Sequence, residues 1–320
     1  MKTAPLYGTV QEDLNRVEAV FDEIKKVDFG PLSEMLGMVL GGGGKLMRPG
    51  LALLCGRFGT YDLNKLVSLA ASVELLHTAT LVHDDVIDSA DTRRGRPTAN
   101  SSFENSTTVM LGDFLFAHAA NRAVETGSLR VVELFSETLM IMARGEIRQD
   151  MAAYDSRQTI RDYLARIGGK TASLFATACE GAGEISEQPE EQVSALREYG
   201  YNFGMAFQVV DDILDFTGDE EEMGKPVGSD LMQGTLTLPS FLLMERSPNG
   251  NPVEAYFEAP SPEKLEAAVQ TIRDSGAVEE SSRMAKHFCG RAIDALSALP
   301  DTADRETLAE LARYILDRQS

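Results

Sequence analysis

The sequence predicts an all-α fold, and three observations lead to that prediction. Apolar residues recur at the three- and four-residue spacing of amphipathic helices along most of the chain. Breaks coincide with glycine and proline, as at Gly41–Gly44, Pro189 and Pro262. No segment shows the convincing apolar–polar alternation of a β-strand. Since no proline-rich or low-complexity linker divides the chain, we expect one domain that spans residues 1–320.

The predicted helices follow one another with short breaks. In the N-terminal part they are Val10–Val27, Pro31–Leu40, a segment from Lys45 to Gly56, a central apolar helix through Val67–Val82, and Val109–Glu125. Further along they are Val131–Met151, Thr159–Ile167 with a continuation past Gly168 and Gly169, a long helix from Pro189 to Phe216, one that begins at Ser261, Val278–Ala298 and Arg305–Arg318. Polar loops are expected around Asp219–Gly228 and Pro248–Pro262.

Composition excludes several classes of function. The chain has 50 acidic and 30 basic side chains, for a net charge of −20, which argues against nucleic-acid binding. Its three cysteines are scattered and match no zinc or redox spacing, as expected of reduced core thiols. The N-terminus lacks a secretory pattern, and no uninterrupted apolar run approaches the roughly 20 residues of a membrane span. We therefore expect a soluble, cytoplasmic protein without a transmembrane segment.

The central helix leads into a first acidic motif, Asp84, Asp85 and Asp88. Asp84 and Asp88 are four residues apart and share a helix face, and His77 lies seven residues before Asp84 on the same side. Carboxylates are rarely buried unless they are paired or hold a metal. Hard cations such as Mg²⁺ prefer carboxylate oxygens. The pattern predicts a buried helix that delivers two aligned acids to the mouth of a cavity.

A second acidic motif repeats the Asp-Asp-x-x-Asp spacing with Asp211, Asp212 and Asp215. Its flanking residues are again apolar, and Gln208 lies three residues before Asp211 and seven before Asp215, on their face. One such triplet alone is more often a solvated helix end. Two triplets inside apolar helices are harder to dismiss, because six converging carboxylates would repel one another strongly without a metal.

Basic residues accompany both motifs. Lys45 and Arg48 follow a glycine run, Arg93, Arg94 and Arg96 follow the first motif, Lys170 and Thr171 follow two glycines, and Lys225 follows the second motif. Arginine and lysine are the usual partners of phosphate oxygens, and glycine lets backbone N–H groups approach an anion. Each residue taken alone would be interpreted as a surface charge. Their placement beside glycines and acids favours a phosphate site.

Taken together, these motifs resemble the trans-type polyprenyl diphosphate synthases. The resemblance covers most of the chain and rests on Gly43–Pro49 (GGKLMRP), Glu74–His77 (ELLH), His83–Asp88 (HDDVID), Arg93–Thr98 (RRGRPT), Lys170–Ala172 (KTA), Phe207–Asp215 (FQVVDDILD), and Gly224-Lys225 through Thr237–Pro239. It implies an all-α bundle around a deep central cavity, of the isoprenoid synthase type, and a homodimer. It also implies Mg²⁺ as cofactor, with isopentenyl diphosphate and an allylic prenyl diphosphate as substrates.

The resemblance further implies a role for each matched residue. Metal ligands would be Asp84, Asp88 and Asp211; the catalytic set would be these with Asp85, Asp212, Asp215, Lys170 and Arg93. The diphosphate of isopentenyl diphosphate would be held by Lys45, Arg48, His77 and Arg94. The allylic diphosphate would be held by Arg93, Lys170, Thr171, Gln208 and Lys225. Pyrophosphate would leave with help from metal and cations, the allylic cation would be attacked by the isopentenyl double bond, and the departing pyrophosphate would accept the lost proton.

Two positions are less clear-cut. Many family members have a lysine where this chain has Thr235, which puts one phosphate contact in doubt but not the reaction. His83 lies one position off the Asp84 face, so it can either support the acids or pack against a neighbour.

Product length depends on what blocks the cavity beneath the first motif. Ala79 and Thr80 lie about one helical turn before Asp84, so we expect them to face the growing tail. Short-chain family members typically have a bulky aromatic residue there, whereas both residues here are small. We therefore expect a product longer than geranylgeranyl, stopped by deeper residues such as Met110, Phe114 or Leu115.

Five other interpretations fit parts of the sequence. A short-chain farnesyl or geranylgeranyl diphosphate synthase is the nearest alternative. A terpene cyclase usually lacks the second acidic motif and the isopentenyl-binding basic residues, and a head-to-head condensing enzyme fits the glycine–lysine and arginine signatures less well. A non-catalytic helical regulatory subunit would not need two intact acidic motifs. A purely structural helical protein would bury acid clusters at a cost without purpose.

Overall fold

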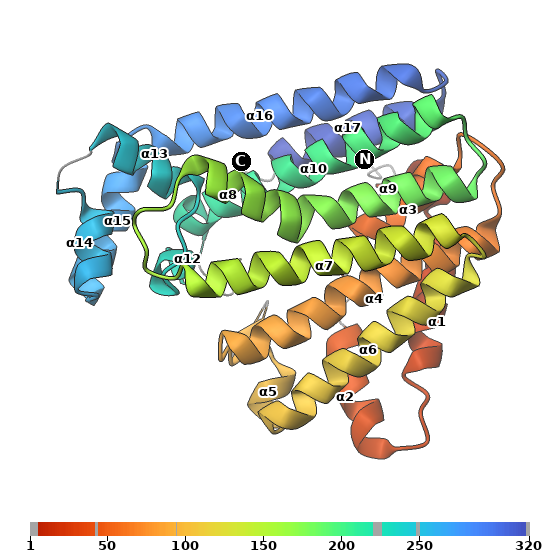
Figure 1. Cartoon of the computed structure of the whole chain (residues 1–320), viewed down its shortest axis with the longest axis horizontal. Helices are drawn as coiled ribbons and strands as arrows, with labels where there is room; N and C mark the ends of the chain where they lie inside the picture. The colour runs from red at the N-terminus through yellow and green to blue at the C-terminus, as the bar shows by residue number, and fades with distance from the viewer. Residues whose placement is uncertain (1–5, 42–43, 94, 220–225, 248–249, 318–320) are drawn as a thin grey trace.

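The computed structural model describes residues 6–41, 44–93, 95–219, 226–247 and 250–317, and these residues confirm the all-α prediction (Figure 1). The first helices are α1 (Leu14–Ile24), α2 (Gly30–Leu40), α3 (Met47–Gly56), α4 (Leu63–Ile87), α5 (Ala99–Ser102), α6 (Asn105–Glu125), α7 (Leu129–Met151) and α8 (Ile160–Ile167). The later ones are α9 (Ser173–Ile185), α10 (Glu190–Thr217), α12 (Ser229–Met232), α13 (Leu238–Arg246), α14 (Pro252–Glu258), α15 (Pro262–Asp274), α16 (Ala277–Ala295) and α17 (Ala303–Asp317).

Several predicted boundaries change. The helix expected from Val10 starts instead with a 3₁₀ turn, Gly8–Val10, and α1 begins at Leu14. The polar loop expected over residues 248–262 contains α14, since the Asn251 side chain accepts a hydrogen bond from the Glu254 N–H (2.9 Å) and caps the helix. Of the other predicted loop, residues 220–225 lie outside the described residues.

A short antiparallel hairpin was not predicted. Strands β1 (Thr92–Arg93) and β2 (Arg96–Pro97) pair with Thr92 opposite Pro97 and Arg93 opposite Arg96. Two residues per strand are too few to leave an alternating pattern in the sequence, so the strand signal was absent. The hairpin follows the first acidic motif directly and holds Arg93 beside it.

Helix α4 lies at the centre of the arrangement. Asp62 caps its N-terminus by accepting hydrogen bonds from the N–H groups of Asn64 and Lys65. Buried residues surround the helix on most sides, and it packs on α3, α6 and α9. In contrast to the sequence expectation, α4 is long and apolar enough to cross a membrane, yet 61% of its most apolar window is buried inside the protein. The length and apolarity of α4 are therefore accounted for by a core helix.

Helices α7, α9, α10 and α16 form the other side of the bundle (Figure 1), with α9 packed on α7 and α10, and α10 packed on α16. One hydrophobic core runs through the chain from Tyr7 to Ile315. A π-helical turn, η2 (Gly168–Ala172), joins α8 to α9 and confirms the predicted continuation past the two glycines. A Cβ on Gly204 of α10 would lie 2.6 Å from the Ala172 Cα, so this glycine allows α10 to approach the turn closely.

Candidate active site

The first acidic motif lies at the C-terminal end of α4 and contacts a lysine from η2. Asp84 is 8% exposed, and its Oδ2 lies 3.2 Å from the Lys170 Nζ. The same ammonium lies 2.5 Å from Oε1 of Glu146 on α7. Burial alone would lower the pKa of Lys170, but the two carboxylates outweigh it and the pKa is raised. Lys170 is therefore a charged ammonium shared between two acids.

The other two acids of this motif differ from Asp84. Asp85 is buried, and its Oδ1 accepts a hydrogen bond from the Arg93 Nε at 2.7 Å. Burial raises the pKa of Asp85, while Arg93 opposes that rise. Asp88 follows the last residue of α4 and is exposed to solvent on one side. The protein around its other side partly desolvates the carboxyl and raises its pKa, and the charge of Asp84 raises it further. The motif thus concentrates negative charge that a cation would relieve.

The second acidic motif lies near the C-terminal end of α10, and its middle member is held by neutral donors. Asp212 is 3% exposed and accepts hydrogen bonds from Tyr163 Oη (2.7 Å) and Gln208 Nε2 (2.8 Å). Burial raises the pKa of Asp212 to about 6, against the lowering effect of these donors. Asp211, one position earlier, is half-buried.

Asp215, the last member, is fully buried and fastens the segment that follows it. Its Oδ1 accepts a hydrogen bond from Ser229 Oγ (2.7 Å), and its Oδ2 accepts one from the Asp230 N–H (3.2 Å). Its backbone oxygen also accepts a hydrogen bond from the Gly228 N–H (2.8 Å). These contacts tie α12 back onto α10.

The two motifs are linked through the π-helical turn. Lys170 contacts Asp84, while its neighbour Thr171 donates from Oγ1 to the Oε1 of Gln208 at 2.6 Å. Gln208 in turn donates to Asp212. The structure therefore brings together five predicted site residues, Asp84, Lys170, Thr171, Gln208 and Asp212, from three elements. A π-turn at this junction is typical of functional sites.

A divalent cation fits the donors present, provided that a ligand completes its shell. Among the described residues, no three His, Cys, Asp or Glu side chains are grouped closely enough to hold a metal by themselves. Mg²⁺ usually takes only one or two protein carboxylates and fills the rest of its shell with water and substrate phosphates. Asp84, in the last turn of α4, and Asp88, the C-cap residue of that helix, are oxygen donors of that kind.

Of the residues predicted to bind isopentenyl diphosphate, Lys45 and Arg48 lie just before and within α3, and His77 lies in α4. Lys45 precedes α3, and its Nζ donates to the Tyr314 Oη of α17 at 2.6 Å. The Arg48 guanidinium lies 4.4 Å from the centre of the Phe175 ring, and His77 is half-buried on α4. Arg94 and Lys225 lie outside the described residues.

His83 packs against α6. Its Nε2 lies 3.0 Å from the Val109 carbonyl oxygen, and its ring occupies the space beside Gly112, where a Cβ would lie 2.1 Å away. Of the two roles left open for His83, these contacts favour packing.

Thr235, which stands where many family members have a lysine, donates its backbone N–H to the Asp230 oxygen at 2.8 Å.

The residues predicted to set product length all belong to α4 or α6, which pack together. Ala79 is fully buried, and Thr80 is half-buried with its hydroxyl donating to the His77 oxygen (2.8 Å). On α6, Leu115 is buried, Phe114 is half-buried and Met110 is 61% exposed.

Sequence reasoning missed Glu146 and Tyr163, both of which contact predicted site residues. Glu146 lies in an amphipathic helix that also has exposed charges, so nothing marked it as partly buried. Tyr163 is fully buried, and a lone tyrosine in a helix carries no sign of the acid it will meet. Tyr163 lies 49 residues before Asp212 in the chain, so the sequence offered no signal of their contact.

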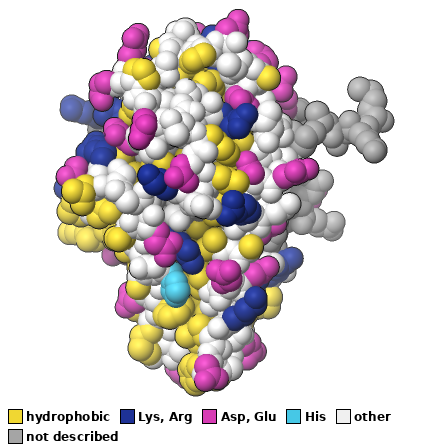
Figure 2. All heavy atoms as spheres, turned by 90° about the vertical axis from the view of Figure 1, so that its right-hand side faces the viewer, with side chains coloured by type: hydrophobic (Ala, Val, Ile, Leu, Met, Phe, Trp, Pro, Cys, Tyr) yellow, Lys and Arg dark blue, Asp and Glu magenta, His cyan; other side chains and the backbone are white. Residues whose placement is uncertain are grey.

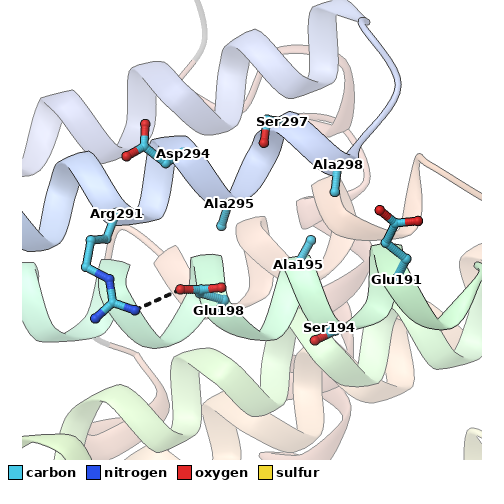
Figure 3. A pocket seen from close by; sticks show the side chains of 9 residues that line it. All are labelled: Glu191, Ser194, Ala195, Glu198, Arg291, Asp294, Ala295, Ser297 and Ala298. Atoms are coloured by element: carbon cyan, nitrogen blue, oxygen red, sulfur yellow. Dashed lines mark hydrogen bonds and ion pairs between the residues drawn. The ribbon is translucent and has the colours of Figure 1, made fainter.

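A surface pocket of about 410 Å³ lies elsewhere, between α10 and α16 (Figure 3). Glu191, Glu198, Arg291 and Asp294 line it, and Arg291 pairs with Glu198 at 2.8 Å. It contains none of the predicted site residues.

Comparison with known proteins agrees with this arrangement. The family model described as "Polyprenyl synthetase" matches residues 30–272. The chain is 40% identical to heptaprenyl diphosphate synthase component 2 of Geobacillus stearothermophilus, with 98% of each chain covered. It is 37% identical to octaprenyl diphosphate synthase of Escherichia coli, with 96% of each covered. A polyprenyl synthase of Caulobacter crescentus, solved in complex with calcium and isoprenyl diphosphate, is 32% identical with a TM-score of 0.92 over 97% of this chain and 96% of that one.

These findings confirm the predicted isoprenoid synthase fold and the predicted enzyme class, a polyprenyl diphosphate synthase. They favour the medium- to long-chain type over the short-chain and regulatory alternatives. The chain belongs to the polyprenyl synthetase family of prenyltransferases.

Proposed function

We propose that this chain is a single-domain, Mg²⁺-dependent enzyme that adds isopentenyl diphosphate head-to-tail onto an allylic diphosphate, in repeated cycles, to make a medium- or long-chain all-trans product. The observation that carries the proposal is the link from Asp84 through Lys170 and Thr171 to Gln208 and Asp212. It supports a shared site between the two acidic motifs, in which a diphosphate could contact both.

The chain's own residues would prepare the allylic diphosphate to leave. Lys170 and Arg93 would contact its oxygens, Thr171 and Gln208 would orient it, and Asp84, Asp88 and Asp211 would hold Mg²⁺. When bound, Mg²⁺ would neutralise negative charge on the diphosphate and so stabilise the departing pyrophosphate. Lys170 pairs with Asp84, and Arg93 pairs with Asp85. To bind the substrate, each cation would exchange hydrogen bonds to its carboxylate for hydrogen bonds to diphosphate oxygens. Lys225 and Arg94 complete the proposed sets.

Product length tests the proposal directly. The purified protein would be incubated with farnesyl diphosphate, isopentenyl diphosphate and Mg²⁺, and the products would be sized. We expect products longer than geranylgeranyl, because Ala79 and Thr80 leave the region below Asp84 without a bulky floor. Products that stop at or below geranylgeranyl would contradict this.

The variant Ala79→Tyr locates the floor itself. A tyrosine would add a bulky ring where Ala79 is now fully buried, so the product should become shorter. Unchanged product length in a variant that keeps its helical content would mean that Ala79 does not face the tail.

A homodimer is proposed because α6 and α7, which pack side by side, carry large apolar residues at their surface. Each of these is at least 59% exposed in the single chain: Met110, Val124, Leu129, Met140, Ile147 and Met151. Apolar surface of this kind usually marks an interface between proteins. Light scattering should give twice the 34.8 kDa of one chain, and Ile147→Asp should shift the mass to that of a monomer.

The name "component 2" of one relative raises a second possibility, in which a different subunit covers this surface. A monomeric, inactive chain that gains activity only with a second protein would favour it over the homodimer.

We also propose that the enzyme is soluble and cytoplasmic and does not bind nucleic acid. On the face in Figure 2, Lys and Arg side chains are interspersed with Asp and Glu and do not gather in one basic patch. Recovery of the activity in the soluble fraction after lysis without detergent is the expected result.

A further inference from the structure

The backbone at Lys45 is held by a tyrosine from the N-terminal region. Tyr7 is buried, and its Oη donates to the carbonyl oxygen of Lys45. Its ring covers Gly50, where a Cβ would lie 2.4 Å from the ring, so only glycine allows this contact. Leu46, the residue after Lys45, has φ +46°, a left-handed conformation that is uncommon for a leucine. Strained backbone of this kind tends to cluster at functional sites.

The side chain of Lys45 is held by a second tyrosine, from α17. Its Nζ donates to the Tyr314 Oη at 2.6 Å and lies 4.9 Å from the centre of the Tyr314 ring. The two residues are 269 positions apart, so the contact joins the C-terminal helix to the segment before α3. Burial, and then the nearby groups Glu74 and Tyr314, raise the pKa of Tyr7.

The partner of Lys45 differs in charge from the partners of Lys170. Lys170 is shared by two carboxylates, which cancel much of its charge until a substrate or cation displaces them. Tyr314 offers a neutral oxygen, and an ammonium has three donors, so two remain for a ligand. In a chain of net charge −20, an oriented lysine whose hydrogen-bond partner is a neutral hydroxyl is well suited to an anion.

We infer that Tyr314 is a positioning residue that holds the Lys45 ammonium in place for the diphosphate of isopentenyl diphosphate. The inference rests on the proposed function and adds α17 to the isopentenyl diphosphate site. Tyr314 acts through Lys45 and therefore affects the binding of one substrate more than the chemical step.

The test is Tyr314→Phe, which keeps the ring and removes only the hydroxyl. Removal of a hydrogen bond to a charged group weakens binding by about tenfold. We expect KM for isopentenyl diphosphate to rise about tenfold, and its Kd from calorimetry to rise in parallel. The KM for the allylic diphosphate and kcat should change by less than about twofold, since Lys170 and the acids are untouched.

Tyr199→Phe is the matched control. The Tyr199 Oη donates to the Leu308 oxygen at 2.8 Å and fastens the same helix, α17, to α10. Within the part of the chain that the structure describes, it makes no hydrogen bond to Lys45. It should lower the melting temperature but leave KM for isopentenyl diphosphate unchanged. An equal rise in KM for both variants would overturn the inference. It would show that KM for isopentenyl diphosphate depends on how α17 packs on the bundle and not on the contact between Tyr314 and Lys45.

An unchanged KM and Kd in Tyr314→Phe would also overturn it. Failure of the proposed function is distinguishable, since in that case the unmodified protein would itself make no polyprenyl diphosphate.

Discussion

The two acidic motifs have the same spacing and apolar surroundings, but the structure surrounds them with different partners. Acids of the first motif pair with cations: Asp84 with Lys170 and Asp85 with Arg93. The last two acids of the second motif accept hydrogen bonds from neutral groups, which are Tyr163, Gln208, Ser229 and the Asp230 N–H. Charged partners can be redistributed when a substrate arrives, whereas neutral donors hold an acid in place. Equal spacing therefore does not imply equal roles, and we expect the first motif to serve chemistry and Asp212 and Asp215 to serve structure.

The largest effect is expected from Asp84→Asn. Loss of this carboxylate removes a proposed metal ligand. Because a bound metal stabilises the transition state by several kcal/mol, kcat should fall by at least about 10³-fold. Stability should be maintained, because Lys170 keeps Glu146 as a partner. Steady-state kinetics and thermal melting would check both. The control is Asp113→Asn, an acid on α6 whose side chain is 68% exposed, which should behave like the unmodified enzyme.

Asp215→Ala should instead act mainly on stability. It leaves the donors of Ser229 and Asp230 without their acceptor, which should lower the free energy of unfolding by about 2–3 kcal/mol. Urea denaturation would measure this, with Ser229→Ala expected to lose about 1 kcal/mol. If Asp215→Ala kept full stability and lost activity as Asp84→Asn does, the two motifs would be equivalent and the comparison would be wrong.

Glu146→Gln sharpens the account of the first motif. Without this carboxylate the Lys170 ammonium rests on Asp84 alone and competes there with a metal. We expect the Mg²⁺ concentration for half-maximal activity to rise about five- to tenfold, as for loss of one charge-assisted hydrogen bond. A titration of activity against Mg²⁺ would show it, and an unchanged midpoint would argue against a shared lysine.

The smallest effect is expected from Tyr163→Phe. It removes one of the two neutral donors to Asp212 and should lower the free energy of unfolding by about 1 kcal/mol. Turnover should remain within a few-fold of the unmodified enzyme, since Gln208 still holds Asp212. A large loss of turnover without loss of stability would assign Asp212 to the chemistry.

The sequence predicted the helices well where they are long and periodic. Helix α10 begins and ends within one residue of its expected limits, and α4 contains the predicted segment Val67–Val82 and extends beyond it at both ends. In both helices the apolar residues span many turns. It failed for α14 and for the β1–β2 hairpin, since seven and two residues per element leave no period to detect.

For the site, the motifs identified the acids and the lysine of η2, but not how each acid is satisfied. Glu146 and Tyr314 reach their lysines only through tertiary packing, from helices far away in the chain. Spacing within one helix reports which side chains share a face, whereas partners from other helices depend on the assembled bundle. The difference between the two motifs was therefore invisible before the structure.

The most direct test of the central claim is a crystal structure with Mg²⁺ and an unreactive thio-analogue of the allylic diphosphate. The account predicts Mg²⁺ at about 2.0–2.1 Å from oxygens of Asp84 and of Asp211, with the diphosphate between them and Lys170 turned toward it. Metal bound instead by Asp212 or Asp215, or a diphosphate that contacts only one motif, would contradict it.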